Sequence, residues 1–395
     1  MKDIIKFTIK STIKVFLKLI PLDERLVILE GNKSYDDNAR AVFELMLKNG
    51  LNSKYKFVWF VDHVNYHKHL ESIPNVKVRA YGKGFKSRTL GDLWDELIFL
   101  YYNCSAKVAI FCNALLGFPW VERQQRIYLG HGLALKNVKG KLGSAKHFTS
   151  VISLSPFFSD VYGVAIPGCS DLITITGYPR NDFLYSFGGM RNRLLTEYKQ
   201  KLKIIWMPTF KHNLNSNRND FSVERDSDVS LLNTVFIEKL NKVLQQLDIL
   251  LVIKFHPFQD LNYVREFNKS NVITMAREDV ERLGCATYEL LSVFDALITD
   301  FSSVVYDFLL LDRPVAFDLT DQQDYQNGIG FIVDNIEEFM PGERILNEDD
   351  FIQFVQHVAR GDDSYASERE RVRNICHTFE DDKSSQRVVN LLNLL

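Results

Sequence analysis

The chain lacks the features that mark several classes of protein. Its five cysteines are scattered, odd in number and never spaced as Cys-x-x-Cys, which excludes a disulfide framework and a cysteine-based zinc site and fits reduced thiols in the cytosol. A formal net charge of only −2 argues against a nucleic-acid partner. No repeat of solenoid type and no low-complexity segment interrupts the sequence. These absences leave a globular intracellular protein.

The chain also has no apolar run of the length that crosses a bilayer. In the first twenty residues, lysines recur every fourth position from Lys2 to Lys18, and apolar residues from Ile5 to Ile20 fill the other side of the same predicted helix. No apolar stretch followed by a cleavage site indicates a secretory signal. Every charge before Pro21 except Asp3 is positive, which favours an anionic membrane surface as the partner. The alternative is a helix that packs its apolar face on the protein.

Short strand-like runs alternate with helical stretches, such as residues 38–48, along the rest of the chain. The length of 395 residues, with 46% hydrophobic residues, is enough for two cores. A first series of strands is predicted at residues 26–29, 57–61, 76–80, 108–111, 127–129 and 151–154, and a second at 204–207, 249–254, 272–275, 296–299 and 314–317. This alternation predicts an α/β protein with two doubly wound, Rossmann-like domains. The predicted divisions are an amphipathic helix at 1–20, an N-terminal domain at 21–190, a C-terminal domain at 191–370 and a helical tail at 371–395.

Two histidines follow apolar strands in unlike settings. His131 stands between Gly130 and Gly132, and His256 precedes Pro257. A histidine at such a strand end is typical of an imidazole that points into a cleft, although many histidines there are only structural hydrogen-bonding groups. Lys136 follows His131 on a glycine-bearing loop, and Lys254 precedes His256 by two residues, which places positive charge near both. The pattern indicates a candidate site that uses two imidazoles.

A third segment has the form of a phosphate-binding turn. The apolar run 296–299 leads through Asp300 into the hydroxyls of Ser302 and Ser303 and then into a helical pattern. Two further segments, a tight turn predicted to present Arg180 and Asp182, and residues 208–211 after a strand, either contact phosphates or are simple turns. Imidazoles together with a phosphate seat predict transfer chemistry on a nucleotide-linked substrate.

The ordered segments resemble a known family. Residues 131–136, 177–182, 208–210, 254–257, 299–307 and 311–314, followed by 341–342 and 382–388, are similar to the motifs of the CDP-glycerol glycerophosphotransferases over residues 125–390. Two segments depart from the family's usual form: residues 130–134 read Gly-His-Gly-Leu-Ala instead of Trp-His-Gly-Thr-Pro, and residues 209–212 read Thr-Phe-Lys-His instead of a form like Thr-Trp-Arg-Asp. The resemblance therefore leaves CDP-ribitol open as a donor beside CDP-glycerol.

The resemblance implies a GT-B-like fold and a peripheral enzyme at the cytoplasmic face of the membrane. Its reaction is the transfer of glycerol phosphate from CDP-glycerol to a lipid-linked glycan or polyol-phosphate acceptor, with release of CMP, in teichoic acid or capsule synthesis. It implies that His131 is the catalytic base, that His256 handles the donor phosphates, and that Gly132 and Lys136 lie on the acceptor side. The donor-binding residues that it implies are Arg180, Thr209, Lys211, Lys254, Asp300, Ser302, Ser303, Asp307 and Arg387.

No cofactor is expected beyond the donor substrate. Asp300 and Asp307, seven residues apart across a turn, make a poor cage for a divalent metal, so the sequence favours stabilisation of the phosphates by protein groups. Two other classes of function remain open. One is a GT-B glycosyltransferase that uses a nucleotide sugar, for which Glu289 is a candidate contact to the ribose. The other is a catalytically silent scaffold at the membrane surface.

Overall fold

The computed structural model describes residues 20–81, 90–113, 123–140, 142–185, 198–208, 231–255, 265–320 and 330–392. The predicted N-terminal helix, Thr209, Lys211 and His256 lie outside these ranges. The chain divides into two compact units. The first contains residues 1–131, 139–182 and 381–395, and the second contains residues 132–138 and 183–380.

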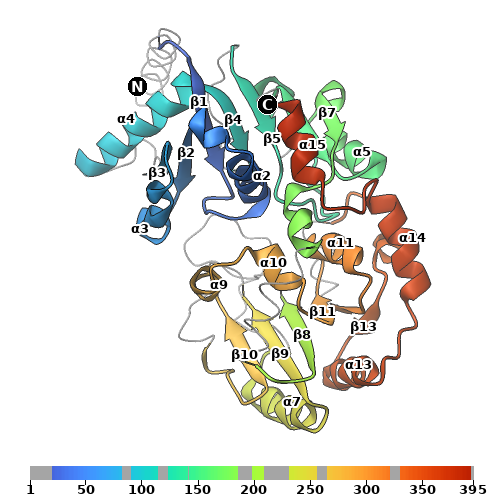
Figure 1. Ribbon diagram of the computed structural model, residues 1–395. Coiled ribbons are helices and arrows are strands. Elements are labelled where there is room, and N and C mark those ends of the chain that lie inside the picture. Colours follow the sequence, from blue (N-terminus) through green and yellow to red (C-terminus); the bar gives the residue numbers. More distant parts are fainter. Residues whose placement is uncertain are drawn as a thin grey trace, which may run out of the picture. The chain divides into compact units, whose positions relative to one another are not determined.

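The first unit is built on a parallel sheet of seven strands in the order β3-β2-β1-β4-β5-β6-β7 (Figure 1). Its strands are β1 (Asp23–Glu30), β2 (Lys56–Val61), β3 (Val76–Ala80), β4 (Ala106–Phe111), β5 (Gln125–Tyr128), β6 (Ser150–Ser153) and β7 (Ile173–Ile175). Its helices are α2 (Asp37–Lys48), α3 (Val64–His67), α4 (Leu90–Ser105), α5 (Pro156–Ala165) and α15 (Ser384–Leu391). The central strands are buried on both faces because helices cover a parallel sheet on both sides.

The second unit repeats this plan with six parallel strands in the order β10-β9-β8-β11-β12-β13. The strands are β8 (Leu202–Met207), β9 (Ile249–Lys254), β10 (Val272–Met275), β11 (Ala296–Thr299), β12 (Val315–Asp318) and β13 (Glu343–Ile345). The helices are α7 (Thr234–Gln246), α9 (Arg277–Leu283), α10 (Thr287–Leu291), α11 (Val304–Phe308), α13 (Glu348–Arg360) and α14 (Ala366–Cys376). In its core the rings of Trp206 and Phe236 lie 5.0 Å and 5.6 Å from the ring of Phe351, edge to face.

Short 3-10 helices complete both units. They span Leu51–Ser53, Lys68–Ser72, Ala145–His147, Ser170–Leu172, Pro179–Tyr185, Leu309–Leu311 and Ile336–Phe339. Several α-helices begin where a polar side chain accepts a hydrogen bond from a backbone N–H that has no partner within the helix. The hydroxyl of Ser155 accepts from Phe158, and the side-chain oxygen of Asn233 accepts from Phe236. Within the described ranges no helix is both long and apolar enough to cross a membrane.

The structure confirms every strand predicted from the sequence and adds two. The additions, β7 and β13, are three-residue strands at the edges of their sheets. A strand of three residues is too short to be distinguished from a loop by its apolar residues. The sequence predicted a separate helical tail at residues 371–395. In the structure, residues 381–395 belong to the first unit. The α/β class with two doubly wound sheets is confirmed.

Each sheet has a topological switch point, where the strand order reverses. In the first sheet it lies between β1 and β4, and in the second between β8 and β11. Ligands of open α/β sheets bind outside the carboxyl ends of the strands at such a point. The two switch points therefore define where to look for function.

A half-buried carboxylate binds the C-terminal helix α15 to the rest of the first unit. The side chain of Asp182 accepts the backbone N–H groups of Ser384 and Ser385, at 2.9 Å and 2.8 Å. Gly177 has a φ of +76°, and a Cβ there would lie 2.4 Å from the hydroxyl of Ser384, so this approach requires glycine. The last helix of the chain is thus part of the first unit's core structure.

Burial raises the pKa of the Asp182 carboxyl above its ordinary value of 3.8, and outweighs the hydrogen bonds from Ser385 and Ser384 that lower it. The folded state therefore holds this proton more tightly than the unfolded chain. The contribution to stability is complete below the ordinary pKa and is lost as the pH rises through the folded pKa. We expect the wild type to lose stability relative to Asp182→Asn when urea unfolding is followed from about pH 3 to about pH 7.

Asp381 gives the matched control with the opposite sign. A side-chain hydrogen bond from Arg387 is the main cause that lowers the pKa of the Asp381 carboxyl. The wild type should therefore gain stability relative to Asp381→Asn as the pH rises over the same range. The same trend in both comparisons would mean that general acid unfolding, and not the local environment of Asp182, sets the result.

Candidate active site

His131 stands on a tight glycine turn at the carboxyl edge of the first sheet, after β5. Gly130 and Gly132 on either side have φ values of +64° and +98°, which L-residues with a Cβ rarely adopt. A Cβ on Gly130 would also lie 2.3 Å from the hydroxyl oxygen of Tyr162. That hydroxyl is 2.8 Å from the hydroxyl of Tyr178, so two buried tyrosines form the wall behind the turn. The half-buried His131 is held at an edge where ligands bind in this kind of sheet.

Side chains from distant segments bind the backbone of this turn. The Asn38 amide nitrogen donates to the carbonyl oxygens of Leu129 and Gly130, at 3.2 Å and 3.0 Å. Arg180 Nη1 donates to the carbonyl oxygen of His131 at 2.7 Å and to Asp37 Oδ1 at 2.9 Å. Asn38 and Arg180 are both buried. The backbone around His131 is therefore fixed by side-chain hydrogen bonds as well as by the sheet.

A buried glutamate closes the switch point of the same sheet. Glu30, the last residue of β1, is fully buried, and its carboxylate accepts three backbone N–H groups. Glu30 Oε1 accepts from Lys33 at 2.7 Å, and Oε2 accepts from Cys112 at 3.1 Å and from Asn113 at 2.9 Å. The carboxylate thereby joins the loop after β1 to the end of β4. Its hydrogen bonds offset the cost of burying the charge.

In the second unit, predicted donor residues gather at the carboxyl ends of β9 and β11. Lys254 is the last residue of β9, and Asp300 directly follows β11, next to β8. The Thr299 hydroxyl donates to the carbonyl oxygen of Met207 at 2.9 Å and joins β11 to β8 at the switch point. Ser302 and Ser303 follow on the turn that leads into α11. The phosphate seat predicted from the sequence therefore lies at the switch point of the second sheet.

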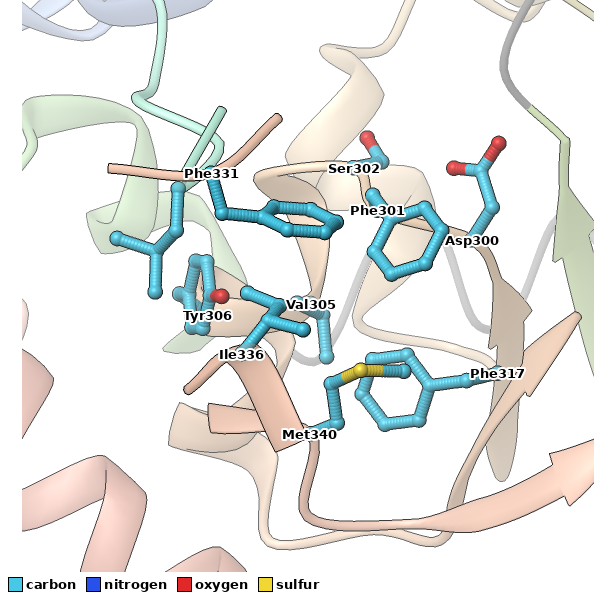
Figure 2. A pocket seen from close by; sticks show the side chains of 10 residues that line it. Asp300, Phe301, Ser302, Val305, Tyr306, Phe317, Phe331, Ile336 and Met340 are labelled. Atoms are coloured by element: carbon cyan, nitrogen blue, oxygen red, sulfur yellow. The ribbon is translucent and has the colours of Figure 1, made fainter. Parts of the chain in front are cut away.

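A small pocket adjoins this turn (Figure 2). Asp300 and Ser302 line it together with apolar side chains: Leu135, Phe301, Val305, Tyr306, Phe317, Phe331, Ile336 and Met340. The rings of Phe301 and Phe331 are 4.9 Å apart. Figure 2 shows the Asp300 carboxylate and the Ser302 hydroxyl along one side and the sulfur of Met340 near the Phe317 ring on another. The pocket therefore has polar groups on the side formed by the turn and mainly apolar side chains elsewhere.

The segment after His131 belongs to the second unit. Lys136 forms an antiparallel bridge with Phe331, and two backbone hydrogen bonds of 2.9 Å flank it, from Asn137 to Gly330 and from Ile332 to Leu135. These contacts fix the backbone of the predicted acceptor-side residue Lys136. Leu135 on the same segment lines the pocket.

Several predicted residues lie in environments that their local sequence does not reveal. The tight turn at 177–182 was expected to present Arg180 and Asp182. This is wrong, because residues 179–182 belong to the 3-10 helix Pro179–Tyr185, Arg180 is buried, and the half-buried Asp182 carboxyl accepts backbone N–H groups of α15. Asp307 is buried and accepts the Tyr288 hydroxyl at 2.9 Å. Arg387 donates to Asp381 and to the carbonyl oxygen of Thr176. Each of these side chains contacts protein groups within its own unit.

The predicted site residues divide between the units. The first unit holds His131, Arg180 and Arg387, and the second holds Gly132, Lys136, Lys254, Asp300, Ser302, Ser303 and Asp307. Ser303 precedes α11 without capping it, since its φ and ψ of −63° and −18° are helical and its side chain makes no capping hydrogen bond. Sequence reasoning missed Glu30, Asp37 and Asn38. The Asp-Asp-Asn run at the start of α2 resembles an ordinary helix start, and only the fold shows where these side chains point.

Known proteins of similar sequence and structure match almost the whole chain. The chain is similar to the teichoic acid poly(glycerol phosphate) polymerase of Bacillus spizizenii, with 24% identity over 97% of this chain and 96% of that protein. The poly(ribitol-phosphate) polymerase of the same organism is 28% identical over 94% of this chain and 57% of its own length. The solved structure of the wall teichoic acid polymerase TagF superposes with a TM-score of 0.73 and 18% identity, over 98% of this chain and 94% of that chain, which confirms the predicted GT-B-like fold. The sequence of residues 12–394 matches the family model of the CDP-glycerol:poly(glycerophosphate) glycerophosphotransferases, and the chain belongs to that family of enzymes.

Proposed function

We propose that this glycerophosphotransferase of teichoic acid synthesis uses CDP-glycerol as its donor and a hydroxyl of a membrane lipid-linked glycan or polyol phosphate as its acceptor. The observation that carries the donor assignment is the position of Asp300 and Ser302 at the switch point of the second sheet, with Lys254 at the end of the neighbouring strand β9, which pairs with β8. A cation and a hydroxyl suit phosphate oxygens, and the adjoining turn supplies backbone N–H groups. Family membership supplies the class of donor.

The proposed reaction is a displacement at phosphorus. The acceptor hydroxyl oxygen forms a bond to the phosphorus next to glycerol, the bond from that phosphorus to the bridging oxygen breaks, and CMP leaves with the electron pair. His131 takes the proton of the attacking hydroxyl, because an alcohol is a poor nucleophile at neutral pH. His256, Lys254, Ser302 and Ser303 are proposed to stabilise the charge on the donor phosphates.

The test is CMP release by the purified protein with a lipid-linked disaccharide acceptor. CDP-glycerol, CDP-ribitol and a UDP-sugar are offered separately, and the released nucleotide is quantified. Turnover with CDP-glycerol establishes the proposal. Turnover with CDP-ribitol alone would reassign the donor, an outcome made specific by the likeness to a poly(ribitol-phosphate) polymerase. Turnover with the UDP-sugar alone would refute the phosphotransferase reaction for this chain. A failure to release nucleotide from any of the three donors would refute it as well.

We propose that the reaction needs no resident cofactor and no divalent metal. The proposal is supported by Asp307, which is buried and accepts the Tyr288 hydroxyl, a contact typical of a structural carboxylate. CMP release is therefore expected to change by less than about twofold in excess EDTA, since the charge is met by protein groups. A loss restored by Mg²⁺ or Mn²⁺ would contradict this.

We propose further that the enzyme binds the cytoplasmic face of the membrane through α4 and the lysine-rich N-terminal segment. Four large apolar residues of α4, between 44% and 65% exposed, recur at helical spacing: Leu93, Trp94, Leu97 and Tyr101. Ile20, two residues after the last of the regularly spaced lysines, packs against Leu100 and Cys104 of α4. Exposed aromatic and aliphatic residues on one helix face are typical of a helix in a bilayer interface, and the lysines in the first twenty residues of the sequence suit anionic lipid.

The double substitution Trp94→Ser with Leu97→Ser is expected to lower sedimentation with vesicles of anionic lipid at least about tenfold, because it removes most of the apolar area of this face. Val235→Ser is the matched control, since Val235 is 78% exposed on α7 in the second unit. Removal of residues 1–19 should also weaken binding and make it less sensitive to salt. Unchanged vesicle binding in both variants would mean that the N-terminal segment packs on the protein instead.

A further inference from the structure

We propose that Asn38, Arg180 and Asp37 form a positioning frame for His131, which sets where its imidazole meets the acceptor hydroxyl. The inference rests on the proposed function for its kinetic consequence. Its structural part concerns the first unit alone, where all four residues lie. In this role Arg180 acts on the His131 turn, and it does not contact the donor as its sequence motif indicated.

The first observation is that three successive carbonyl groups are each bound by a side chain of the frame. The Leu129 and Gly130 oxygens accept from the single amide group of Asn38, and the His131 oxygen accepts from Arg180. A turn with glycines on both sides of its central residue has high backbone freedom in the absence of other contacts. Hydrogen bonds to every carbonyl from the strand end to His131 remove that freedom.

The second observation is that the frame residues also bind one another. The Arg180 backbone N–H donates to Asn38 Oδ1 at 3.0 Å, and Arg180 Nη1 is shared between Asp37 and His131. Asn38 donates its own backbone N–H to Asp37 Oδ1 at 2.8 Å. Asp37 has a φ of +62°, a conformation that L-residues with a Cβ other than Asn and Asp seldom adopt. The three residues form one connected unit.

The third observation is the burial of the cation. Arg180 is 2% exposed, its guanidinium lies 5.0 Å from the centre of the Tyr178 ring, and the carboxylate of Asp37 balances its charge. A buried guanidinium in these contacts is held in place as a rigid fork. Arg180 therefore transmits the position of α2 and of the 3-10 helix Pro179–Tyr185 to the His131 carbonyl.

The expected effect is on the rate more than on donor binding. A general base works only within about 2.6–3.2 Å of the proton that it takes, and a misplacement of about 1 Å costs on the order of 10²-fold in rate. Asn38→Leu removes both hydrogen bonds that the amide donates, and also the acceptor of the Arg180 N–H, while it keeps the branching and the number of non-hydrogen side-chain atoms. We expect kcat to fall by about 10- to 100-fold while KM for CDP-glycerol changes by less than about twofold.

The control is Asn103→Leu. Asn103 is equally buried in the first unit, and its amide donates to the Phe99 carbonyl oxygen at 2.8 Å within α4, away from the turn. This variant removes a comparable hydrogen bond and should leave kcat within about twofold. Asp37→Asn is the second frame variant, because asparagine tolerates a positive φ while the change removes the charge that holds Arg180. It keeps the test possible if Asn38→Leu does not fold.

Two readouts separate positioning from general structural damage. In the substrate-free protein with ¹⁵N- and ¹³C-labelled histidine, the His131 ring signals, identified by their loss in His131→Gln, should shift or broaden in Asn38→Leu and Asp37→Asn and stay in place in Asn103→Leu. In the kinetic readout, Asn38→Leu should cause no further loss of rate in a His131→Ala background, because the frame acts only through His131.

Unchanged His131 signals in the frame variants, or rate losses that multiply in the double variant, would overturn the positioning role. The NMR readout needs no turnover, so it decides the structural part even if no donor releases CMP. An inactive wild type would instead refute the proposed function. The two failures are therefore distinguishable.

Discussion

His131→Ala is expected to lower kcat for CMP release by about 10²- to 10⁴-fold, because the acceptor hydroxyl then has no general base. The measurement is the initial rate of CMP release at saturating CDP-glycerol and acceptor. The removal of a side chain between two glycines should leave the fold intact, so the unfolding midpoint in urea should stay close to that of the wild type. Binding of CDP-glycerol, followed by calorimetry, should also persist, since the proposed donor residues lie in the second unit.

His69→Ala is the matched control for this substitution. His69 is an exposed histidine of the same unit, and its Nδ1 lies 3.2 Å from the Tyr66 carbonyl oxygen. Its removal should leave the rate of CMP release unchanged. A His131→Ala variant with wild-type kcat would show that another group accepts the proton and would remove His131 from the mechanism.

Glu30→Ala is expected to destabilise the protein by about 3–5 kcal/mol. The substitution leaves the N–H groups of Lys33, Cys112 and Asn113 without the buried carboxylate that they share. The N–H of Cys112 keeps the main-chain carbonyl oxygen of residue 30 as an acceptor, at 3.1 Å in the wild type, so the cost falls mainly on the N–H groups of Lys33 and Asn113. The measurement is the midpoint and slope of urea unfolding followed by circular dichroism.

Glu24→Ala provides the comparison on the same strand. Glu24 is 69% exposed and pairs with Lys107 at 2.9 Å, so its loss should cost about 0.5 kcal/mol or less. Near-equal effects of the two substitutions would mean that water enters and replaces the Glu30 carboxylate. The predicted difference would then be absent, and Glu30 would not be the link between β1 and β4.

The fold was predictable because its central strands are continuous apolar runs. In a parallel sheet covered on both faces, residues such as those of β2 and β9 are almost all buried, and the sequence shows them directly. The edge strands β7 and β13 were missed for the same reason: each has only three residues, all of them half-buried in β7 and two of them in β13, so neither gives an apolar run. The switch points followed only once the strand order was known.

The site was predictable in part. His131 has glycines on both sides, and the turn at Asp300 follows a clear strand, so both carry a local signal. The partners of Asn38 are carbonyl oxygens 91 and 92 residues away, and no local pattern reveals such a contact. Arg180 was expected at a surface turn and is buried because Asp37, 143 residues away, supplies the opposite charge. Long-range polar contacts of this kind are settled by the fold.

The phosphate seat shows the same limit on a smaller scale. The order of strand, hydroxyl turn and helix is present, but α11 spans only Val304–Phe308 and Ser303 does not cap it. The helical pattern in the sequence continues because the 3-10 helix Leu309–Leu311 follows directly. Apolar periodicity identifies a helical stretch without distinguishing α from 3-10 geometry.

The return of the C-terminus to the first unit has a consequence for biosynthesis. During translation, residues 183–380 are synthesised before the segment that carries Ser384, Ser385 and Arg387. The second unit has all its residues while the first still lacks α15, with the Asp182 carboxylate and the face of α2 that α15 covers exposed to water. The half of the protein that is synthesised first is therefore completed last, and a nascent chain stalled before residue 381 carries an open first unit as a substrate for chaperones and proteases.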